Sequence, residues 1–191
     1  MKEFFLALLL FSGFTAVAQV SGSVTRKVPK EYSLEVGYRY VFHQTRIDNK
    51  ASQGYGALFD YAWQLSGFDG TKAKSFISVP MGYTIMLPDD PSQKRITMLN
   101  YGWTVRHELK KQARWMPFVG YGLFLNTLRF EGIDGGVFGH QTQFDFGYNF
   151  NTSSRLQYFA KLQYSYTSYP QLNESERIKY HYADIRLGVR F

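Results

Sequence analysis

The sequence of 191 residues contains no cysteine, which excludes a disulfide framework, a thiolate nucleophile and any cysteine-based metal site. Histidine is scarce as well, with four residues, so a metal site would have to combine histidine with carboxylates. The mean hydropathy of −0.30 excludes a bundle of transmembrane helices. We therefore expect neither a metal nor any other cofactor.

Aromatic residues are abundant instead: Phe occurs 17 times and Tyr 15 times, and hydrophobic residues make up 45% of the chain. This content is too high for a disordered chain, and the length suits one domain. The net charge is +7, and basic charge combined with many aromatics can indicate nucleic-acid binding. Here the aromatics follow a strand pattern and the chain begins with an export signal, so we expect no nucleic-acid partner.

The first residues have the features of a secretory signal peptide. An apolar run over residues 4–14 is followed by Ala16 and Ala18, which fit an A-x-A cleavage site. The run is too short to span a bilayer as a helix, and the alternative is a buried N-terminal helix. The sequence predicts a signal peptide over 1–18, a polar lead over 19–30 and one domain over 31–191.

Beyond residue 30, apolar and polar residues alternate with a period of two, which is typical of β-strands with two different faces. In the first such segment, Leu34 and Val36 lie on one face, and Glu35 and Arg39 lie on the other. Pro80 lies inside the third segment, although strand interiors rarely accept proline. The eight segments are about 31–43, 54–66, 74–87, 94–109, 115–129, 137–150, 155–168 and 178–191.

Two architectures produce such alternation. A soluble sandwich or lipocalin-like barrel turns its apolar face inward, whereas an outer-membrane barrel turns it toward lipid and keeps polar residues in the lumen. The second is favoured because the segments reach the roughly 9–11 residues that cross a bilayer. Their apolar faces are rich in Tyr, Phe and Trp, their polar faces combine glycine with isolated charges, and an even strand number closes without an edge. We predict an all-β fold, an eight-stranded antiparallel up-and-down transmembrane β-barrel over 31–191 with a plugged polar lumen.

The charges on the predicted inner faces balance. Charges in a narrow lumen are tolerable only when paired, and an eight-stranded barrel is roughly filled by its own side chains. Equal numbers of both signs therefore predict ion pairs that plug the lumen, whereas a selective pore would favour one sign. The predicted lumen residues are Arg39, Arg106, Lys161, Arg186 and Arg190 with Glu35, Asp60, Glu108, Asp145 and Asp184.

With the N-terminus placed in the periplasm, the excess of positive charge gathers at the periplasmic rim. The other rim and its loops hold equal numbers of basic and acidic residues. Basic residues at a rim can contact anionic lipid headgroups or an acidic partner, or form only a solvated surface. The residues of the basic rim are Arg26, Lys27, Lys30, Lys72, Lys74, Lys110, Lys111, Arg114 and Arg155, against Glu31 and Asp69.

The chain ends in an alternating segment whose last residue is Phe191. This ending resembles the C-terminal signature by which outer-membrane barrels are recognised for assembly. With the signal peptide and the eight segments, the chain resembles the small OmpA/OmpX-type outer-membrane β-barrel superfamily over nearly all of its mature length. The Ala18-Gln19 cleavage site and the Tyr-rich strands resemble barrels of Bacteroidota, in which such small barrels include accessory subunits of larger outer-membrane machines.

Some barrels of this size modify lipid A. The deacylase type carries a His-x-Ser-Asn signature, but residues 140–143 read His-Gln-Thr-Gln, so both key positions differ. The palmitoyltransferase type places His, Asp and Ser at the outer rim; by strand parity His43 points inward there, whereas His140 and His181 point outward. His107 lies near the opposite rim, and we predict no catalytic residue. The other residues that could approach the rim histidines are Asp48, Asp89 and Ser175.

These observations predict a non-enzymatic outer-membrane barrel with a structural or accessory role. Its expected partners are outer-membrane lipid and other outer-membrane proteins, including a larger assembly to which it could dock. Two alternatives stay open: a narrow pore for small solutes and an envelope lipid-modifying enzyme.

Overall fold

A computed structural model of the chain describes residues 28–45, 50–68, 73–110, 114–132, 135–150, 155–170 and 177–191. The predicted signal peptide over 1–18 and most of the predicted lead lie outside these residues. Asp48, Asp69 and Ser175, named above as rim residues, lie outside them as well.

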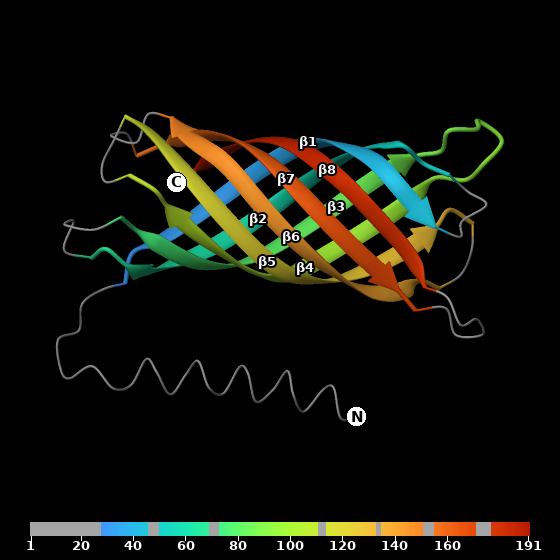
Figure 1. Cartoon of the computed structure of the whole chain (residues 1–191), viewed down its shortest axis with the longest axis horizontal. Coiled ribbons are helices and arrows are strands. Elements are labelled where there is room, and N and C mark those ends of the chain that lie inside the picture. Colours follow the sequence, from blue (N-terminus) through green and yellow to red (C-terminus); the bar gives the residue numbers. More distant parts are fainter. Residues whose placement is uncertain are drawn as a thin grey trace, which may run out of the picture.

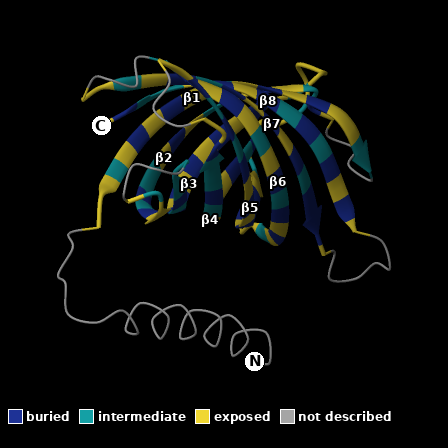
Figure 2. Cartoon of the chain, turned by 60° about the vertical axis from the view of Figure 1, so that its left-hand side comes forward, coloured by how far each residue is buried: buried dark blue, intermediate teal, exposed yellow. Residues whose placement is uncertain are grey.

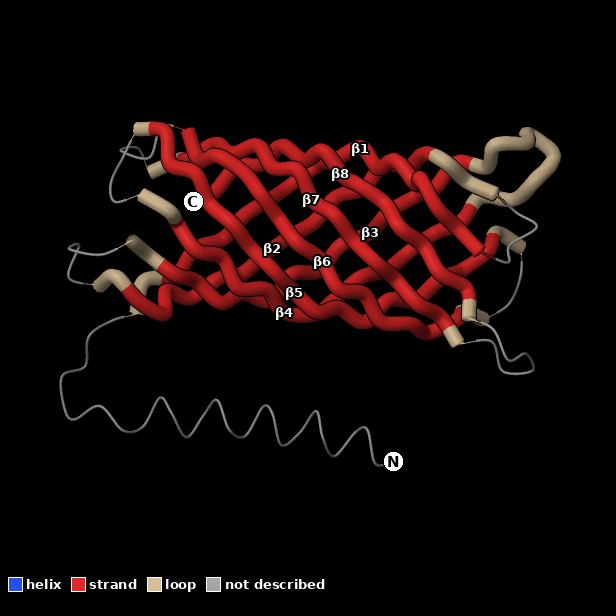
Figure 3. Tube along the Cα trace, viewed as in Figure 1, coloured by secondary structure: helices blue, strands red, loops and turns tan. Residues whose placement is uncertain are grey.

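Eight antiparallel strands close into a barrel in sequence order, β1-β2-β3-β4-β5-β6-β7-β8, with β8 paired to β1 (Figures 1 and 3). Connections of only six to eight residues join consecutive strands. The first strand begins and the last ends at the same end of the barrel (Figure 1). The strands are β1 Lys30–Thr45, β2 Gln53–Ser66, β3 Ser75–Leu87, β4 Ile96–Glu108, β5 Trp115–Phe130, β6 Val137–Phe150, β7 Gln157–Tyr169 and β8 Ile178–Arg190.

Burial alternates along every strand, because successive side chains point to opposite faces of the wall (Figure 2). Glu35 is only 5% exposed, whereas the next residue, Val36, is 64% exposed. The outer wall is covered by Tyr, Phe, Leu, Ile and Val side chains, and the lumen holds polar and charged side chains together with an apolar cluster at one end. The predicted all-β, eight-stranded antiparallel barrel is confirmed, and its apolar face is turned outward.

Three irregularities occur in the ladders, one of them a register shift between Gln64 and Ser66 in the pairing of β2 with β3. A bulge between Val41 and His43 shifts the pairing of β1 with β8. Pro80 lies within β3, and the β3–β4 register skips from Ser78 to Met81 because proline has no N–H to donate. The alternation of inward and outward side chains therefore continues through Pro80, although the β3–β4 ladder has a gap there.

No helix long and apolar enough to cross a membrane occurs in the described part of the chain.

Candidate functional site in the barrel lumen

A chain of six buried charges of alternating sign crosses the lumen. They come from four neighbouring strands, β6, β7, β8 and β1, whose inward faces meet at the same level. Alternating signs let each buried charge lie next to at least one opposite charge, which is the condition for tolerating charge in a low-dielectric interior. In order of contact they are Arg39, Asp184, Arg186, Glu35, Lys161 and Asp145.

The contacts are short within each half of this chain, although the terminal contact of Lys161 with Asp145 is looser, at 3.6 Å. Arg39 binds Asp184 with two hydrogen bonds, and Arg186 Nη2 lies 3.1 Å from Asp184 Oδ2. Lys161 Nζ lies 3.0 Å from Glu35 Oε1 and 2.9 Å from Glu35 Oε2. The link between the two halves is the longest, with Arg186 Nη1 4.0 Å from Glu35 Oε2. The lumen centre is therefore held by two tight ionic groups that touch.

A layer of amide and hydroxyl side chains continues this network toward the end of the barrel that carries the β1–β2 and β7–β8 connections. Asn126 Nδ2 donates to Gln141 Oε1 at 2.9 Å, and Tyr182 Oη donates to the same oxygen at 2.5 Å. Gln163 Nε2 donates to Asp184 Oδ2 at 3.1 Å, which joins the layer to the ionic chain. Each of these side chains is buried, so their mutual bonds replace the water that they would otherwise need.

Beyond this layer, the same end of the lumen is filled by apolar side chains, which the sequence analysis missed. Met86, Met98 and Leu128 are fully buried there, although polar residues were expected inside. The signal was present, because these residues share strand parity with the polar inner positions. The cluster comprises Val41, Ala51, Met86, Ile96, Met98, Leu128, Tyr169, Ile178, Tyr180 and Tyr182.

Arg39 joins the apolar and ionic layers. Its guanidinium carbon lies 3.6 Å from the centre of the Tyr182 ring, and its Nη1 lies 3.2 Å from Met98 Sδ. The side chain is 1% exposed. A planar guanidinium can stack on a ring while its edge binds a carboxylate, and lysine lacks this combination.

At the other end, two further arginines close the mouth of the lumen. Arg106 Nη2 binds Glu31 Oε2 at 2.5 Å, and Arg190 Nη1 donates to Asn149 Oδ1 at 2.5 Å. Arg190 also lies over the ring of Phe159, 4.3 Å from its centre. Glu31 was assigned to the basic rim; the structure turns it into the mouth of the lumen, because the inward parity of β1 extends to its second residue.

The remaining predicted lumen residues are less tightly held. Glu108 is buried, and its Oε1 lies 4.0 Å from Arg106 Nη2. Asp60 forms no ion pair within the described residues, and its Oδ1 has no hydrogen-bond partner there. It lines a cavity of about 20 Å³ beside Glu35 and Lys161, which is the room that roughly one water molecule needs.

The histidines lie on the outer face, and one of them corrects the parity assignment. His43, predicted to point inward, is exposed, because the bulge turns it out beside His181 with ring centres 5.4 Å apart. His181 Nδ1 lies 2.9 Å from Tyr164 Oη, and His140 is exposed, so both point outward. In the described ranges, no group of three or more His, Asp or Glu could hold a metal ion.

One Ser–His pair was not considered from the sequence. Ser75 Oγ lies 2.8 Å from His107 Nδ1 across the β3–β4 ladder, close to the end of the barrel where the chain begins. A serine nucleophile also needs a histidine oriented by a third group. Among the residues that the structure describes, no carboxylate hydrogen-bonds to this ring.

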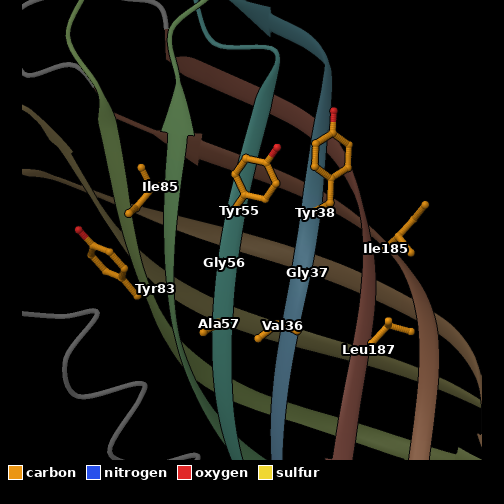
Figure 4. A pocket seen from close by; sticks show the side chains of 10 residues that line it. All are labelled: Val36, Gly37, Tyr38, Tyr55, Gly56, Ala57, Tyr83, Ile85, Ile185 and Leu187. Atoms are coloured by element: carbon orange, nitrogen blue, oxygen red, sulfur yellow. The ribbon is translucent and has the colours of Figure 1, made fainter.

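A shallow apolar groove of about 600 Å³ runs along the outer wall over β8, β1, β2 and β3 (Figure 4). Its floor is the backbone of Gly37 and Gly56 with the small side chain of Ala57, and larger side chains form its walls. The hydroxyl groups of Tyr38 and Tyr55 point toward the same end of the barrel (Figure 4). The groove is a hollow in the apolar outer wall.

No protein-family model matches the sequence, and no curated protein matches it. Solved structures do match. Neisserial surface protein A (NspA) is 13% identical with a TM-score of 0.62, over 86% of this chain and 98% of that one. The N-terminal β-barrel domain of Pseudomonas aeruginosa OprF is 13% identical over 86% of this chain and 100% of that one, with a TM-score of 0.47.

The outer membrane enzyme PagL is also similar, with 13% identity over 82% of this chain and 97% of that one and a TM-score of 0.44. At 13% identity, such likeness carries the fold and leaves the activity open. The NspA match agrees with the closed eight-stranded wall described above. The chain thus has the fold of the small eight-stranded outer-membrane β-barrels.

Proposed function

We propose that the protein is an integral outer-membrane barrel with a sealed lumen and a structural or accessory role. It is exported by its signal peptide and inserts with both chain ends on the periplasmic side. The observation that supports this is the filling of the lumen in successive layers: an apolar cluster, an amide layer, the six-charge chain and the arginine mouth. A solute would have to displace paired charges and a close-packed apolar layer, and both cost free energy.

Conductance in planar lipid bilayers tests the seal. We expect no single-channel steps from the purified barrel at moderate voltage, with a known porin in the same bilayer as positive control. A second sample, in which Arg39, Asp184 and Met98 are all changed to Ala, opens a path through two layers and should show steps if insertion succeeded. Steady conductance of the unaltered protein would establish a pore instead.

The accessory role predicts contact with another membrane component on the outer wall. The groove over β8, β1, β2 and β3 is a hollow on this wall where a convex neighbour could pack closely, because the outward side chain of Ala57 is small and leaves the nearby backbone uncovered. A photo-crosslinking residue at Ala57, in native membranes, should capture one defined protein. The same residue at Phe144 of β6, on the far side of the barrel, is the matched control. Equal capture at both positions, or none at either, would count against docking through the groove.

Lipid modification is a second candidate, which one observation favours: the Ser75–His107 hydrogen bond at the membrane-facing surface. Mass spectrometry of lipid A and phospholipids from cells with and without the protein tests it. A change of acyl chains that disappears in Ser75→Ala would replace the structural role by an enzymatic one.

A further inference from the structure

One end of the barrel carries an almost purely positive rim. We call it the terminal rim, since β1 begins and β8 ends there. Of its five described cations, four are exposed and Lys74 is half-buried. The two carboxylates nearby, Glu31 and Glu108, face the lumen mouth and lie against Arg106. In the described part of this rim, no acidic side chain is exposed. The terminal rim consists of Lys30, Lys74, Lys110, Arg114 and Arg155.

The opposite end, the loop rim, differs in sign balance. Exposed Lys and Arg side chains occur there too, but Asp89, Asp90 and Glu131 are exposed beside them. Two acidic side chains also organise the loops: Asp89 accepts hydrogen bonds from Ser52, and Asp90 accepts them from Ser92. The charge asymmetry is thus a property of the folded barrel and not only of the sequence.

Aromatic side chains fix the depth of the terminal rim in a membrane. Trp115 is 61% exposed and packs edge-on against Phe150, with ring centres 5.0 Å apart. On the other side of the rim, Tyr32 stacks on Tyr61 at 4.8 Å. Tyr and Trp settle at the boundary between hydrocarbon and headgroups. Arg114, next to Trp115 on the terminal side, therefore lies at the level of the lipid phosphates.

The cations are also distributed around the barrel. They lie at the terminal ends of β1, β3, β4, β5 and β7, which is most of the circumference. A protein partner covers one side of a barrel, whereas lipids surround it. Long cationic side chains can rest their aliphatic stems on the wall and extend their charge into the headgroup layer.

We infer that the terminal rim is a ring of sites for anionic phospholipid headgroups in the leaflet that faces the chain ends. The inference rests on the proposed membrane insertion. Each contact of a Lys or Arg with an anionic surface favours binding by about fivefold. The ring would concentrate anionic lipid around the barrel and resist its tilting or inversion.

Fluorescence quenching by brominated lipids tests the inference. Trp63→Phe and Trp103→Phe leave Trp115 as the single fluorophore, at the terminal rim. The barrel is refolded into vesicles that mix phosphatidylcholine with phosphatidylglycerol, and either lipid is brominated in turn. We expect at least a fivefold relative binding preference for phosphatidylglycerol, which falls toward one at high salt.

Two five-site variants separate the rims. Changing the five terminal rim cations to Gln should abolish the preference for phosphatidylglycerol. Changing five cations of the loop rim to Gln should leave this preference intact. In that control the substituted residues are Lys50, Arg95, Arg129, Arg177 and Lys179.

The outcomes are distinct. Equal quenching by both lipids in the unaltered barrel would overturn the inference while leaving membrane insertion intact. A preference for phosphatidylglycerol that persists after the terminal rim cations are changed to Gln would also overturn the inference. If the terminal variant instead loses a co-purifying acidic protein but shows unaltered lipid preference, the rim binds protein. A chain that stays in solution without lipid or detergent contradicts the proposed function itself.

Discussion

Arg39 and Asp184 face each other directly across the junction of β1 and β8, and two hydrogen bonds join them. Nε donates to Oδ1 at 2.7 Å and Nη2 donates to Oδ2 at 2.9 Å, with both side chains 1% exposed. Such a bidentate pair is among the stronger interactions between side chains. It also joins the first and last strands, so it lies where the barrel closes.

Breaking this pair by one substitution should cost more than removing it entirely. Arg39→Met leaves Asp184 buried beside Arg186 alone, and Asp184→Asn leaves Arg39 uncompensated. We expect each to lower the free energy of unfolding by about 3–5 kcal/mol. The double variant Arg39→Met with Asp184→Leu should cost less than either single variant, because no unpaired charge of this pair stays buried. Urea unfolding from lipid vesicles measures this; additive losses would show that the two side chains do not stabilise each other.

The apolar cluster predicts a contrast between two leucines of β5. Leu128 is fully buried in the lumen, whereas Leu125 is 53% exposed on the outer wall. Leu128→Ala leaves a cavity and should cost about 2–5 kcal/mol. Leu125→Ala should cost much less, because lipid can fill the space. If both variants lose the same free energy of unfolding in lipid vesicles, the apolar cluster in the lumen is not closely packed.

Gly188 of β8 should tolerate no side chain. A Cβ there would collide with the ring of Phe159 and lie 2.8 Å from the carbonyl oxygen of Leu34. Gly188→Ala should therefore reduce the folded fraction, seen as loss of the fast-migrating band on unheated gels. Gly82→Ala is the matched control, since its nearest neighbours lie 3.3 Å and 3.4 Å away. A normal yield of folded Gly188→Ala would indicate that Phe159 moves freely.

Phe191 should matter more for assembly in cells than for the stability of the finished barrel. Its backbone exchanges two hydrogen bonds of 2.9 Å with Tyr32, which another residue could also make. We propose that its side chain serves as the recognition signal. Phe191→Ala should lower the amount in the outer membrane several-fold while refolding normally from urea in vitro. Phe144→Ala, which removes another exposed outer ring, controls for lost apolar surface. An equal drop in the outer-membrane amount of both variants would refute a special role for Phe191.

Asp90 should titrate at an unusually low pH. The backbone N–H and the hydroxyl of Ser92 both donate to its carboxylate and hold the pKa of Asp90 below its ordinary value. The stabilisation of this turn is therefore present above the ordinary pKa of Asp and lost as the pH falls through the lowered pKa. Carboxyl NMR titration should show the shift diminished in Ser92→Ala. An unchanged titration in this variant would assign the shift to another cause.

The alternation of apolar and polar residues predicted the wall because a barrel wall between lipid and lumen requires a period of two at every strand. The second strand was predicted over 54–66 and spans Gln53–Ser66. The period fails at His43, where a bulge inserts an extra residue that no local signal announced. Parity assigns each charge to a face but not to a partner, so the pairing of Arg39 with Asp184 required the register of β1 against β8.

The apolar lumen end was missed for a different reason. We assumed that inner faces are polar throughout, which holds only where water or paired charges fill the lumen. Met98 and Leu128 share the inner parity of Asn100 and Asn126, so their positions could be predicted but their mutual packing could not. The packing of the cluster depends on how the ends of six strands, β1, β3, β4, β5, β7 and β8, converge in space.

The closure of the barrel by Arg39 and Asp184 has a consequence for how the polypeptide can be rearranged. The pair comes from opposite ends of the chain, while the backbones of Tyr32 and Phe191 already lie side by side. A circular permutant that links these ends and opens the β4–β5 connection would form the same ionic contact early, between neighbours in sequence. Its insertion kinetics would reveal whether sealing the seam is the slow event of biogenesis.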